Sequence, residues 1–242
     1  MKRMEQKNNI KVAIHQPDYI PYLGFFYKMW QVEKFVYLDD CQFSNVNWHH
    51  WNRIKTPQGE CRLKIPVEQH LGDLINCVRT KDELGWKDKH LKTIEMNYGK
   101  TKYFKVFFED FKELLMPTYK SIADMNMEIN TFIAKKFGFG NKITYAKSSD
   151  MSIQTFREER VLDICNKLNG DIYISGNGAR AYEDEEHFKA RGLQLIYTDY
   201  QAIEYLQAWG EFIPNLSVID FICNCGYDWD LVLKKVKEKQ QG

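Results

Sequence analysis

The pattern that most constrains the fold is a strand, a helix and a second strand near the N-terminus. Residues 10–15 alternate and are β-branched, which predicts a strand that ends before Gln16-Pro17. Apolar residues at helical spacing over residues 22–32 predict a helix, and the apolar run at residues 35–38 predicts a second strand. Two strands joined by a helix within about thirty residues form a βαβ unit, so we expect them to be parallel and adjacent.

The rest of the chain alternates predicted strands and helices around a helical block. Amphipathic segments predict this block of helices at residues 86–98, 102–116 and 122–137. Strands are expected at residues 62–67, 73–78, 143–146, 172–174 and 193–198, and helices at 155–168, 182–191, 217–223 and from 229 onward. This order predicts an α/β fold with a mostly parallel, Rossmann-like sheet, helices on both faces and a helical insertion. We assign residues 1–242 to a single α/β domain with a helical subdomain at about 85–140.

Charge and hydropathy narrow the classes of partner. The 242-residue chain carries 34 basic and 33 acidic side chains, a net charge of +1, which gives no global reason to expect nucleic acid as a partner. No apolar run approaches the ~18 residues that a membrane-spanning helix needs, so we expect no membrane span. Residues 1–9 are basic and polar with no apolar signal core after them, so we expect a cytoplasmic location.

Cysteine spacing argues against both disulfides and zinc. Six cysteines are spread over the chain, which is not the pattern of a small disulfide framework. Cys223 and Cys225 form a C-x-C pair, but no second pair and no histidine stand at zinc-ligand spacing. We therefore predict no metal site. No cysteine has a local catalytic signature, and no G-x-S-x-G nucleophile elbow is present.

The least ordinary polar residues follow the predicted strands, where ligands of parallel sheets bind. His15 and Gln16 end the first strand, and the histidine either acts as a general base near neutral pH or ties down the Pro-rich turn. Asp39, Asp40 and Gln42 follow the second strand. Consecutive side chains of an extended segment point to opposite faces, so the two carboxylates are not a paired dyad. One can bind a ligand while the other caps a turn.

Residues 44–59 are polar and turn-rich, which predicts a loop. They also include two tryptophans, whose large apolar rings favour packing against another part of the structure. Within this loop, Arg53 and Lys55 can hold a pyrophosphate, and Asn52 can read a base or a sugar hydroxyl. The alternative is a solvated basic loop without a ligand. In the tail, Tyr205 and Gln207 are candidate substrate-binding residues.

A glycine-rich turn, Ser-Gly-Asn-Gly-Ala-Arg at residues 175–180, joins a predicted strand to a helix. Ser175, Gly176 and Gly178 let backbone amides approach a ligand closely, and Arg180 adds positive charge for an anion. Plain turns can have the same composition. The turn is neither a Walker loop nor the G-x-G-x-x-G fingerprint. Further along, Ser217 is predicted to cap a helix, with Asp220 at N3 of a variant capping box.

Several motifs, taken in chain order, resemble one family. They are H-Q-P-D-Y-I-P-Y-L-G-F-F-Y-K at 15–28, D-D-C-Q-F at 39–43, N-R-I-K-T-P-Q-G at 52–59, Y-I-S-G-N-G-A-R-A-Y at 173–182, Y-L-Q at 205–207 and F-I-P-N-L-S-V-I-D at 212–220. Together they resemble the WbqC-like proteins of bacterial surface-polysaccharide clusters over almost the whole chain. The departures are Tyr22, where family members often have Trp, and Cys41, where a small aliphatic residue is usual.

The resemblance implies a biosynthetic context more than a reaction. Genes for such proteins stand beside genes for O-antigen and lipopolysaccharide enzymes, including those that make nucleotide-linked amino sugars. Some of these sugars carry acyl groups derived from amino acids, such as glycyl. The resemblance therefore suggests a tailoring transferase that places an acyl or aminoacyl group on the amine of a nucleotide sugar.

Such a reaction needs a base for the amine proton and donors for the tetrahedral oxyanion. We assign the base to His15, with Asp40 orienting the histidine or the amine. Gln16 and Gln42 would supply hydrogen bonds to the oxyanion or to the substrate. Asn52, Arg53 and the turn at 175–180 would hold the phosphates. The acyl donor would be an acyl-carrier-protein thioester, coenzyme A or an activated amino acid.

Two alternatives remain open. The strand, the Tyr22-Leu23-Gly24-Phe25 segment and the late Ser175–Arg180 turn resemble class I nucleotidyltransferases, although both histidines of their H-x-G-H motif are missing. That interpretation predicts ATP binding with magnesium. A non-catalytic adaptor is the other alternative, in which residues 43–51 hold a partner enzyme. It predicts that Trp48 and Trp51 matter in the cell while His15 does not.

Overall fold

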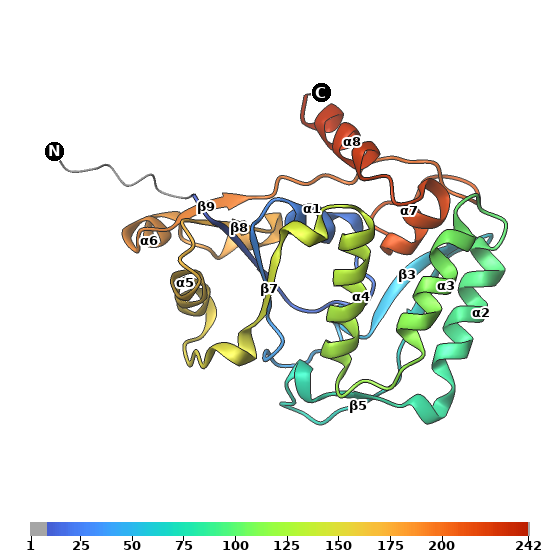
Figure 1. The fold of residues 1–242 in the computed structure, drawn as a ribbon, viewed down its shortest axis with the longest axis horizontal. Coiled ribbons are helices and arrows are strands. Elements are labelled where there is room, and N and C mark those ends of the chain that lie inside the picture. Colours follow the sequence, from blue (N-terminus) through green and yellow to red (C-terminus); the bar gives the residue numbers. More distant parts are fainter. Residues whose placement is uncertain (1–8, 242) are drawn as a thin grey trace. The chain divides into compact units, whose positions relative to one another are not determined.

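The computed structural model describes residues 9–241 (Figure 1). Its chain forms two compact units. The described residues of the first unit are 9–15, 27–38 and 142–200, and those of the second are 16–26, 39–141 and 201–241. We describe each unit by itself. The assignment of the whole chain to one domain with a helical subdomain stays a prediction.

The first unit is built on a five-stranded sheet whose strands are all parallel. In spatial order the strands are β7 (Thr144–Lys147), β2 (Lys34–Tyr37), β1 (Lys11–His15), β8 (Ile172–Ser175) and β9 (Gln194–Tyr197). Counted along the chain this order is 3-2-1-4-5, the Rossmann arrangement. The prediction that the first two strands are parallel and adjacent is confirmed, with His15 opposite Tyr37.

Helices cover both faces of this sheet, as the sequence predicts. On one face, α5 (Arg157–Lys167) and α6 (Glu185–Ala190) pack on a core that includes Val12, Val36 and Tyr173, and the Tyr173 and Phe188 rings stack at 5.7 Å. On the other face lies the end of α1 (Leu23–Trp30), whose Met29 sulfur accepts a hydrogen bond from the Tyr145 hydroxyl at 3.8 Å. Successive side chains of a strand point to opposite faces, so the continuous buried runs of β1 and β2 supply apolar residues to both faces of the sheet.

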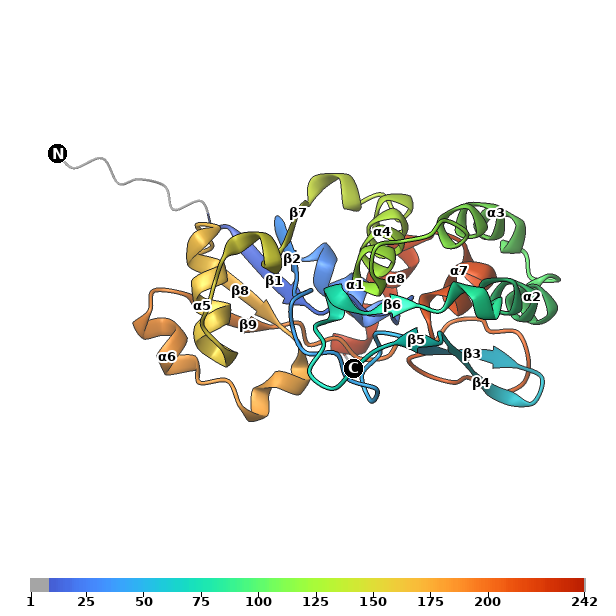
Figure 2. The same ribbon diagram turned by 90° about the horizontal axis from the view of Figure 1, so that it is seen from below.

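The second unit combines two hairpins with helices. The strands are β3 (Trp51–Thr56) paired with β4 (Gly59–Lys64), and β5 (Val67–Glu68) paired with β6 (Arg79–Thr80). The helices are α2 (Trp86–Tyr98), α3 (Phe104–Leu115), α4 (Ile122–Lys136), α7 (Val218–Cys225) and α8 (Trp229–Gln241). The helices α2, α3 and α4 lie side by side, and the hairpin β3–β4 is seen clearly from below (Figures 1 and 2).

Three local predictions are wrong, each for a physical reason. The polar loop at 44–59 contains strand β3, because Trp51 and Ile54 are buried and pairing with β4 satisfies the backbone. A strand predicted at 73–78 is replaced by the 3-10 turn Ile75–Cys77, in which only Ile75 is buried. The helix predicted at 182–191 begins at Glu185 instead, because the Asp184 side chain accepts the backbone N–H groups of Glu186 and His187.

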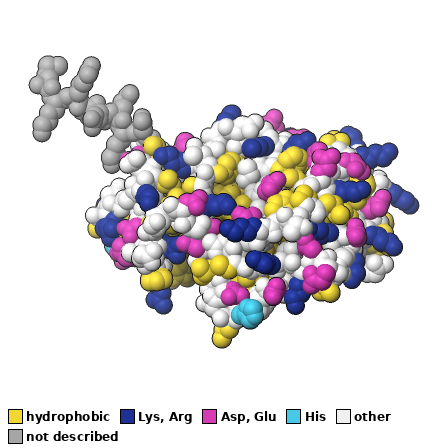
Figure 3. Space-filling model, turned by 60° about the horizontal axis from the view of Figure 1, so that its bottom comes forward, with side chains coloured by type: hydrophobic (Ala, Val, Ile, Leu, Met, Phe, Trp, Pro, Cys, Tyr) yellow, Lys and Arg dark blue, Asp and Glu magenta, His cyan; other side chains and the backbone are white. Residues whose placement is uncertain are grey.

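Within residues 9–241, no helix is long and apolar enough to span a membrane. On the face shown in Figure 3, basic side chains are interspersed with acidic ones, with no broad patch of a single sign. This distribution agrees with the near-zero net charge of the sequence.

Candidate functional site

In the sheet of the first unit, the direction in which successive strands are added reverses between β1 and β8. Strands added after β1 lie on one side of it in β2 and β7, and on the other side in β8 and β9. Such a switch point leaves a crevice beyond the carboxyl ends of the two central strands, where α/β proteins bind ligands. The ladder between β1 and β8 ends at Ala13 and Ile174, so His15 and Ser175 lie just beyond the last paired residues.

Lys28 of α1 supplies a buried cation at this edge. Its side chain is 6% exposed, and its ammonium donates to the Ile14 carbonyl at 2.7 Å. Ile14 lies one residue past the end of the β1–β8 ladder, which stops at Ala13. A buried ammonium keeps its charge only where acceptors or a counter-charge surround it. Lys28 therefore places a fixed positive charge at the switch point.

Glu183 provides the counter-charge, at the end of the turn that follows β8. Its carboxylate accepts a hydrogen bond from the Ser175 hydroxyl at 2.8 Å. Burial raises the pKa of Glu183, while the Ser175 hydroxyl, the Lys28 ammonium and the Tyr197 hydroxyl act in the opposite direction. A carboxyl whose pKa is raised toward neutrality can donate or accept a proton during a reaction.

The glycine-rich turn begins at the same edge. Residues Asn177–Ala181 form a short 3-10 helix directly after β8. Arg180 lies over the Tyr197 ring at 4.1 Å and pairs with Asp199 at 2.5 Å, while the Asn177 side chain accepts the Asp199 N–H at 2.9 Å. A Cβ built on Gly176 or Gly178 would meet no atom within 4 Å. The backbone of the turn is therefore open to a ligand.

His15 and Gln16 are both half-buried. His15 is the last residue of β1, and its carbonyl accepts the Leu38 N–H at 2.8 Å. Gln16 begins the second unit, which also contains Asp39, Asp40 and Gln42. His15 belongs to the same unit as Ser175, Gly176, Gly178 and Arg180, and their shared site role stays a prediction.

Asp39 and Asp40 differ in environment. Asp39 is 2% exposed and accepts a hydrogen bond from the Asn76 amide at 3.4 Å, whereas Asp40 is half-buried. Both residues lie in a turn after β2 and not in an extended segment, so the strand alternation behind the sequence expectation does not apply to them. Gln42 is exposed and forms an isolated bridge with Leu74.

In the second unit, Asn52 fixes the Pro-rich loop at residues 17–21. Its amide donates to the carbonyls of Tyr19 and Ile20, both at 2.9 Å, and its oxygen accepts the Arg53 N–H. Asn52 is 3% exposed, so these backbone contacts account for the side chain without a ligand. The Ser217 hydroxyl also donates to the Ile20 carbonyl, at 2.7 Å.

Lys55, Tyr205 and Gln207 meet in one buried network around Asp220. The Lys55 ammonium donates to Gln207 at 3.0 Å and to the Glu211 carbonyl at 2.5 Å. Asp220 accepts the hydroxyls of Tyr98 and Tyr205, each at 2.8 Å. Burial raises the pKa of Asp220, and the two hydroxyls and Lys55 oppose that shift. The network joins β3, α2 and α7.

The capping-box prediction is correct for Ser217 and wrong for Asp220. The Ser217 hydroxyl accepts the Ile219 N–H at 3.3 Å and caps α7. The Ser217 N–H, which a capping box would direct to residue 220, donates to the Arg53 carbonyl instead. The carboxylate of Asp220 turns inward because two buried tyrosines need an acceptor.

Arg53 is tied down as well. It forks onto both oxygens of Glu60 at 2.8 and 2.9 Å, donates to the Asn215 carbonyl and lies 5.5 Å from the Trp48 ring centre. The Trp48 and Trp51 rings pack at 4.0 Å, and Arg62 lies 3.9 Å from the Trp51 ring centre. The tryptophans of the predicted loop thus pack between two guanidinium groups.

Comparison with known families decides the assignment. The model of the WbqC-like protein family matches residues 16–229. The chain belongs to the WbqC-like protein family. A relative from Mycobacterium tuberculosis, the uncharacterized protein Rv1507c, is 30% identical over 224 residues, which cover 89% of this chain and 94% of that protein. No solved structure matches the chain.

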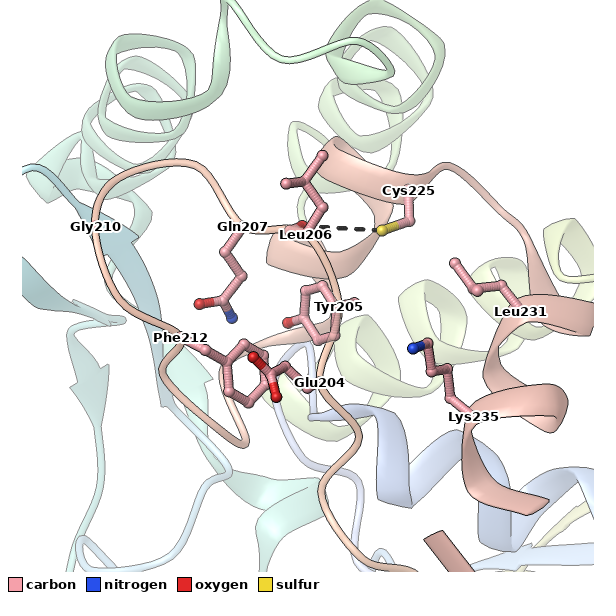
Figure 4. Close-up of a pocket in the computed structure, with 9 residues that line it drawn as sticks. All are labelled: Glu204, Tyr205, Leu206, Gln207, Gly210, Phe212, Cys225, Leu231 and Lys235. Carbon is pink, nitrogen blue, oxygen red and sulfur yellow. Dashed lines mark hydrogen bonds between the residues drawn. The ribbon is translucent and has the colours of Figure 1, made fainter. Parts of the chain in front are cut away.

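The WbqC-like chain also has an open pocket in its second unit, of about 510 Å³. Its floor is aromatic, from Tyr205 and Phe212, and Leu231 and Lys235 of α8 complete one side (Figure 4). Burial raises the pKa of the lining thiol Cys225 to about 11, so it stays protonated at neutral pH. The polar ends of Tyr205 and Gln207 are already bonded inside the protein, whereas Glu204 and Lys235 bring charged groups to the lining.

Sequence reasoning missed Lys28 and Glu183 in this WbqC-like site. Lys28 is a single charge within the apolar run at 25–30, and that isolation was the available signal. Glu183 stands among several acids at 183–186, so nothing in the pattern singles it out. In residues 9–241, no group of three or more His, Cys, Asp or Glu side chains is arranged to hold a metal ion.

Proposed function

We propose that this WbqC-like protein is a tailoring transferase of surface-glycan biosynthesis. It transfers an acyl or aminoacyl group, for example glycyl, to the amine of a nucleotide-linked amino sugar. The observation that carries the proposal is the switch-point edge of the first unit, where Lys28, His15, Ser175 and the open glycine turn gather. The surface-glycan context comes from the family, and a nucleotide-linked acceptor implies a reaction in the cytoplasm.

Binding of the nucleotide diphosphate is the first role of this edge. The backbone of Gly176 and Gly178 is open to close approach, and Arg180 adds a guanidinium that can fork onto phosphate oxygens. Arg180 is 52% exposed and already oriented by Tyr197 and Asp199, so it can contact a ligand without losing its position. The buried Lys28 ammonium adds a long-range attraction for the anion.

Proton transfer is the second role. The sugar amine attacks the acyl carbon, so an N–C bond forms and the C–S or C–O bond of the donor breaks. His15 takes the proton from the attacking nitrogen and returns it to the leaving group. Glu183 lies at the same edge with a raised pKa, so it can replace or assist the histidine. The donor is a carrier-protein thioester, coenzyme A thioester or activated amino acid.

Asp40, Gln16, Gln42, Asn52, Lys55, Tyr205 and Gln207 remain predicted participants. They belong to the second unit, and the proposal rests on the first unit alone. The bonds of Asn52, Lys55 and Gln207 inside the protein favour structural roles for these three.

A transfer assay tests the proposal. Purified protein is incubated with amino-sugar nucleotides and each donor class, and products are followed by mass spectrometry. We expect an acylated nucleotide sugar, with His15→Ala slowing its formation about 10²–10⁴-fold, the usual contribution of a general base. An unchanged rate in His15→Ala would remove the histidine from the mechanism, and absence of product with every donor would count against acyl transfer.

A nucleotidyltransferase-like activity is the second candidate function. Its nucleotide would bind at the same switch point of the sheet and at the same late turn. It predicts adenylylated product and pyrophosphate when ATP and magnesium are supplied. The adaptor hypothesis predicts that Trp48→Ala abolishes function in cells while His15→Ala does not.

A further inference from the structure

The Pro-rich loop at residues 17–21 is held with unusual completeness. Each of its five carbonyls accepts a hydrogen bond from a distant segment of the same unit. The donors are the amides of Asn126 (to Pro17), Asn130 (to Asp18) and Asn52 (to Tyr19 and Ile20), the hydroxyl of Ser217 (to Ile20) and the backbone N–H of Val218 (to Pro21). Loops rarely have every carbonyl fixed in this way, so the position of the loop matters.

Ile20 shows that this position is imposed against local preference. Its φ is +38°, a left-handed conformation that is a true outlier for a β-branched residue. Ile20 is fully buried, so its backbone is enclosed by protein contacts. Strain of this kind persists only where surrounding contacts over-determine the backbone, and it gathers at functional sites.

The fixed loop carries a carboxylate–imidazole pair. Asp18 Oδ1 lies 3.2 Å from His49 Nδ1. His49 is 0% exposed and Asp18 8% exposed, and the Phe43 ring, 5.6 Å from the His49 ring, packs against the imidazole. The Asn126 amide donates to the His49 carbonyl, so α4 holds both partners of the pair. A carboxylate can accept hydrogen bonds but cannot donate them. The proton of a neutral His49 therefore sits on Nδ1, and Nε2 is left as a hydrogen-bond acceptor.

Buried polar atoms without a partner cluster around this pair. Among the described residues they include His49 Nε2, both ring nitrogens of His50, Asn126 Oδ1 and Asn130 Oδ1. A buried polar atom without a hydrogen-bond partner destabilises the folded state, so a native protein rarely leaves several together. Burial lowers the pKa of His50 to about 4, so that ring is neutral at pH 7 and offers one donor and one acceptor. Acceptors therefore outnumber donors by four to one.

We propose that Asp18 and His49 form a proton-transfer dyad whose Nε2 takes a proton from a primary amine. An amine is the class of ligand that this acceptor-rich cluster fits, because it brings several N–H donors to one atom. Asp18 fixes the tautomer and orientation of the imidazole, as carboxylates do in other acid–base sites. In the step itself, Nε2 takes a proton from the ammonium form of the amine: an N–H bond of the ammonium breaks, an Nε2–H bond forms, and the neutral amine keeps the electron pair. This amine site lies in the second unit and goes beyond the proposed function, and its amine binding can be measured without acyl transfer.

The second unit contains a matched control for this dyad. His70 Nδ1 lies 3.4 Å from Asp73 Oδ2, a similar spacing, but the His70 side chain is 82% exposed. An exposed pair of this kind is solvated and contributes little. Any response that His49 shows and His70 does not show therefore reports the buried cluster.

Nitrogen NMR of ¹⁵N-histidine-labelled full chain tests the dyad directly. We expect His49 to carry its proton on Nδ1, and its Nε2 resonance to move saturably when glucosamine or methylamine is added. Glucose and methanol, which lack the amine, should leave it unmoved, and His70 should respond to none of them. A response of His49 to the hydroxyl compounds equal to that with the amines would indicate ordinary solvent in the cluster and overturn the proposal.

Two variants separate proton transfer from a structural role. His49→Asn keeps a side-chain donor for Asp18 but has no acceptor at Nε2, and Asp18→Asn keeps the shape but loses the carboxylate. We expect Asp18→Asn to abolish the saturable NMR response of His49 to amines, and this result decides the dyad even where His49→Asn does not fold. An amine response that survives in Asp18→Asn would contradict the inference.

Discussion

Single polar side chains hold much of this protein's backbone in place. Asn52 is the clearest case, because one buried amide satisfies two consecutive carbonyls and one N–H. No aliphatic side chain can replace these contacts, and water cannot reach the carbonyls that would be left unpaired. The strained backbone at Ile20 depends on the same amide.

Replacing Asn52 should therefore destabilise the fold more than a typical polar substitution. We expect Asn52→Ala to lower the free energy of unfolding by about 3 kcal/mol, since buried acceptors lose their donor. Urea unfolding followed by circular dichroism measures the change. The exposed Asn45→Ala serves as the control and should shift it by less than about 0.5 kcal/mol. Equal stability of the two variants would show that the loop does not depend on Asn52.

Gly176 separates binding from folding at the candidate site. A Cβ there would meet no atom within 4 Å, and the residue has an ordinary φ of −78°. Gly176→Ala should thus leave the melting temperature unchanged and weaken binding of a nucleotide sugar roughly tenfold, by blocking close approach of the phosphate. Titration calorimetry measures the affinity.

Gly170 gives the opposite pattern and serves as the comparison. A Cβ there would lie 2.5 Å from the Val12 side chain, so Gly170→Ala should destabilise the first unit by about 1–3 kcal/mol. Its effect on affinity should be small once the protein is folded. Unchanged affinity in Gly176→Ala would place the phosphates elsewhere.

At the scale of elements, α2 shows how a helix is tied to its neighbours by a neutral histidine. His90 contacts the Tyr19 hydroxyl at 3.0 Å and the Lys64 carbonyl at 3.2 Å. The ring is 6% exposed, and burial lowers the pKa of His90 to about 4 from an ordinary 6.5, with the Lys64 contact opposing. The helix therefore depends on an imidazole that must stay uncharged.

Stability should fall on acidification for this reason. Between pH 6.5 and 4 the unfolded chain binds a proton at His90 that the folded protein does not, so the free energy of unfolding decreases as pH falls through this interval. Above pH 6.5 the effect is absent. His50 contributes in the same direction. The slope of the free energy of unfolding against pH, measured by urea unfolding at several pH values, reports the number of protons taken up on unfolding. In His90→Gln this number should be smaller by about one.

The exposed Asn45→Ala variant, which removes no titratable group, should keep the wild-type slope. A His90→Gln slope equal to that of the wild type would mean that His90 is protonated equally in both states.

Elements with strong local patterns were predictable from sequence. The bounds of α2 agree residue for residue with the prediction, and those of α3 and α4 differ from it by one or two residues. Strand β3 was not predictable, because its polar composition hides burial that only the pairing with β4 creates. Asp220 looked like a cap because sequence spacing cannot reveal the two tyrosines that reach it from elsewhere.

At the scale of the whole molecule, chain order predicted the parallel sheet and the pairing of β1 with β2, but not that β8 lies on the other side of β1. Pairing of β1 with β8 joins residues that are about 160 positions apart, and no local pattern encodes it. The same limit applies to the candidate site. His15 and the turn at 175–180 were predictable because each follows a strand, whereas Lys28 and Glu183 acquire meaning only through contacts across the first unit.

In the proposed function, the switch-point edge of the first unit binds a nucleotide-linked amino sugar. The most direct test is a thermal-shift panel of wild type and Arg180→Ala with amino-sugar nucleotides, free nucleotides, ATP with magnesium, and coenzyme A. A ligand at ~100 times its Kd adds ~2.7 kcal/mol of stability, which raises Tm measurably. We predict selective stabilisation of the wild type by an amino-sugar nucleotide, reduced in Arg180→Ala. Stabilisation by ATP alone, by no compound, or to an equal extent in both proteins would contradict the claim.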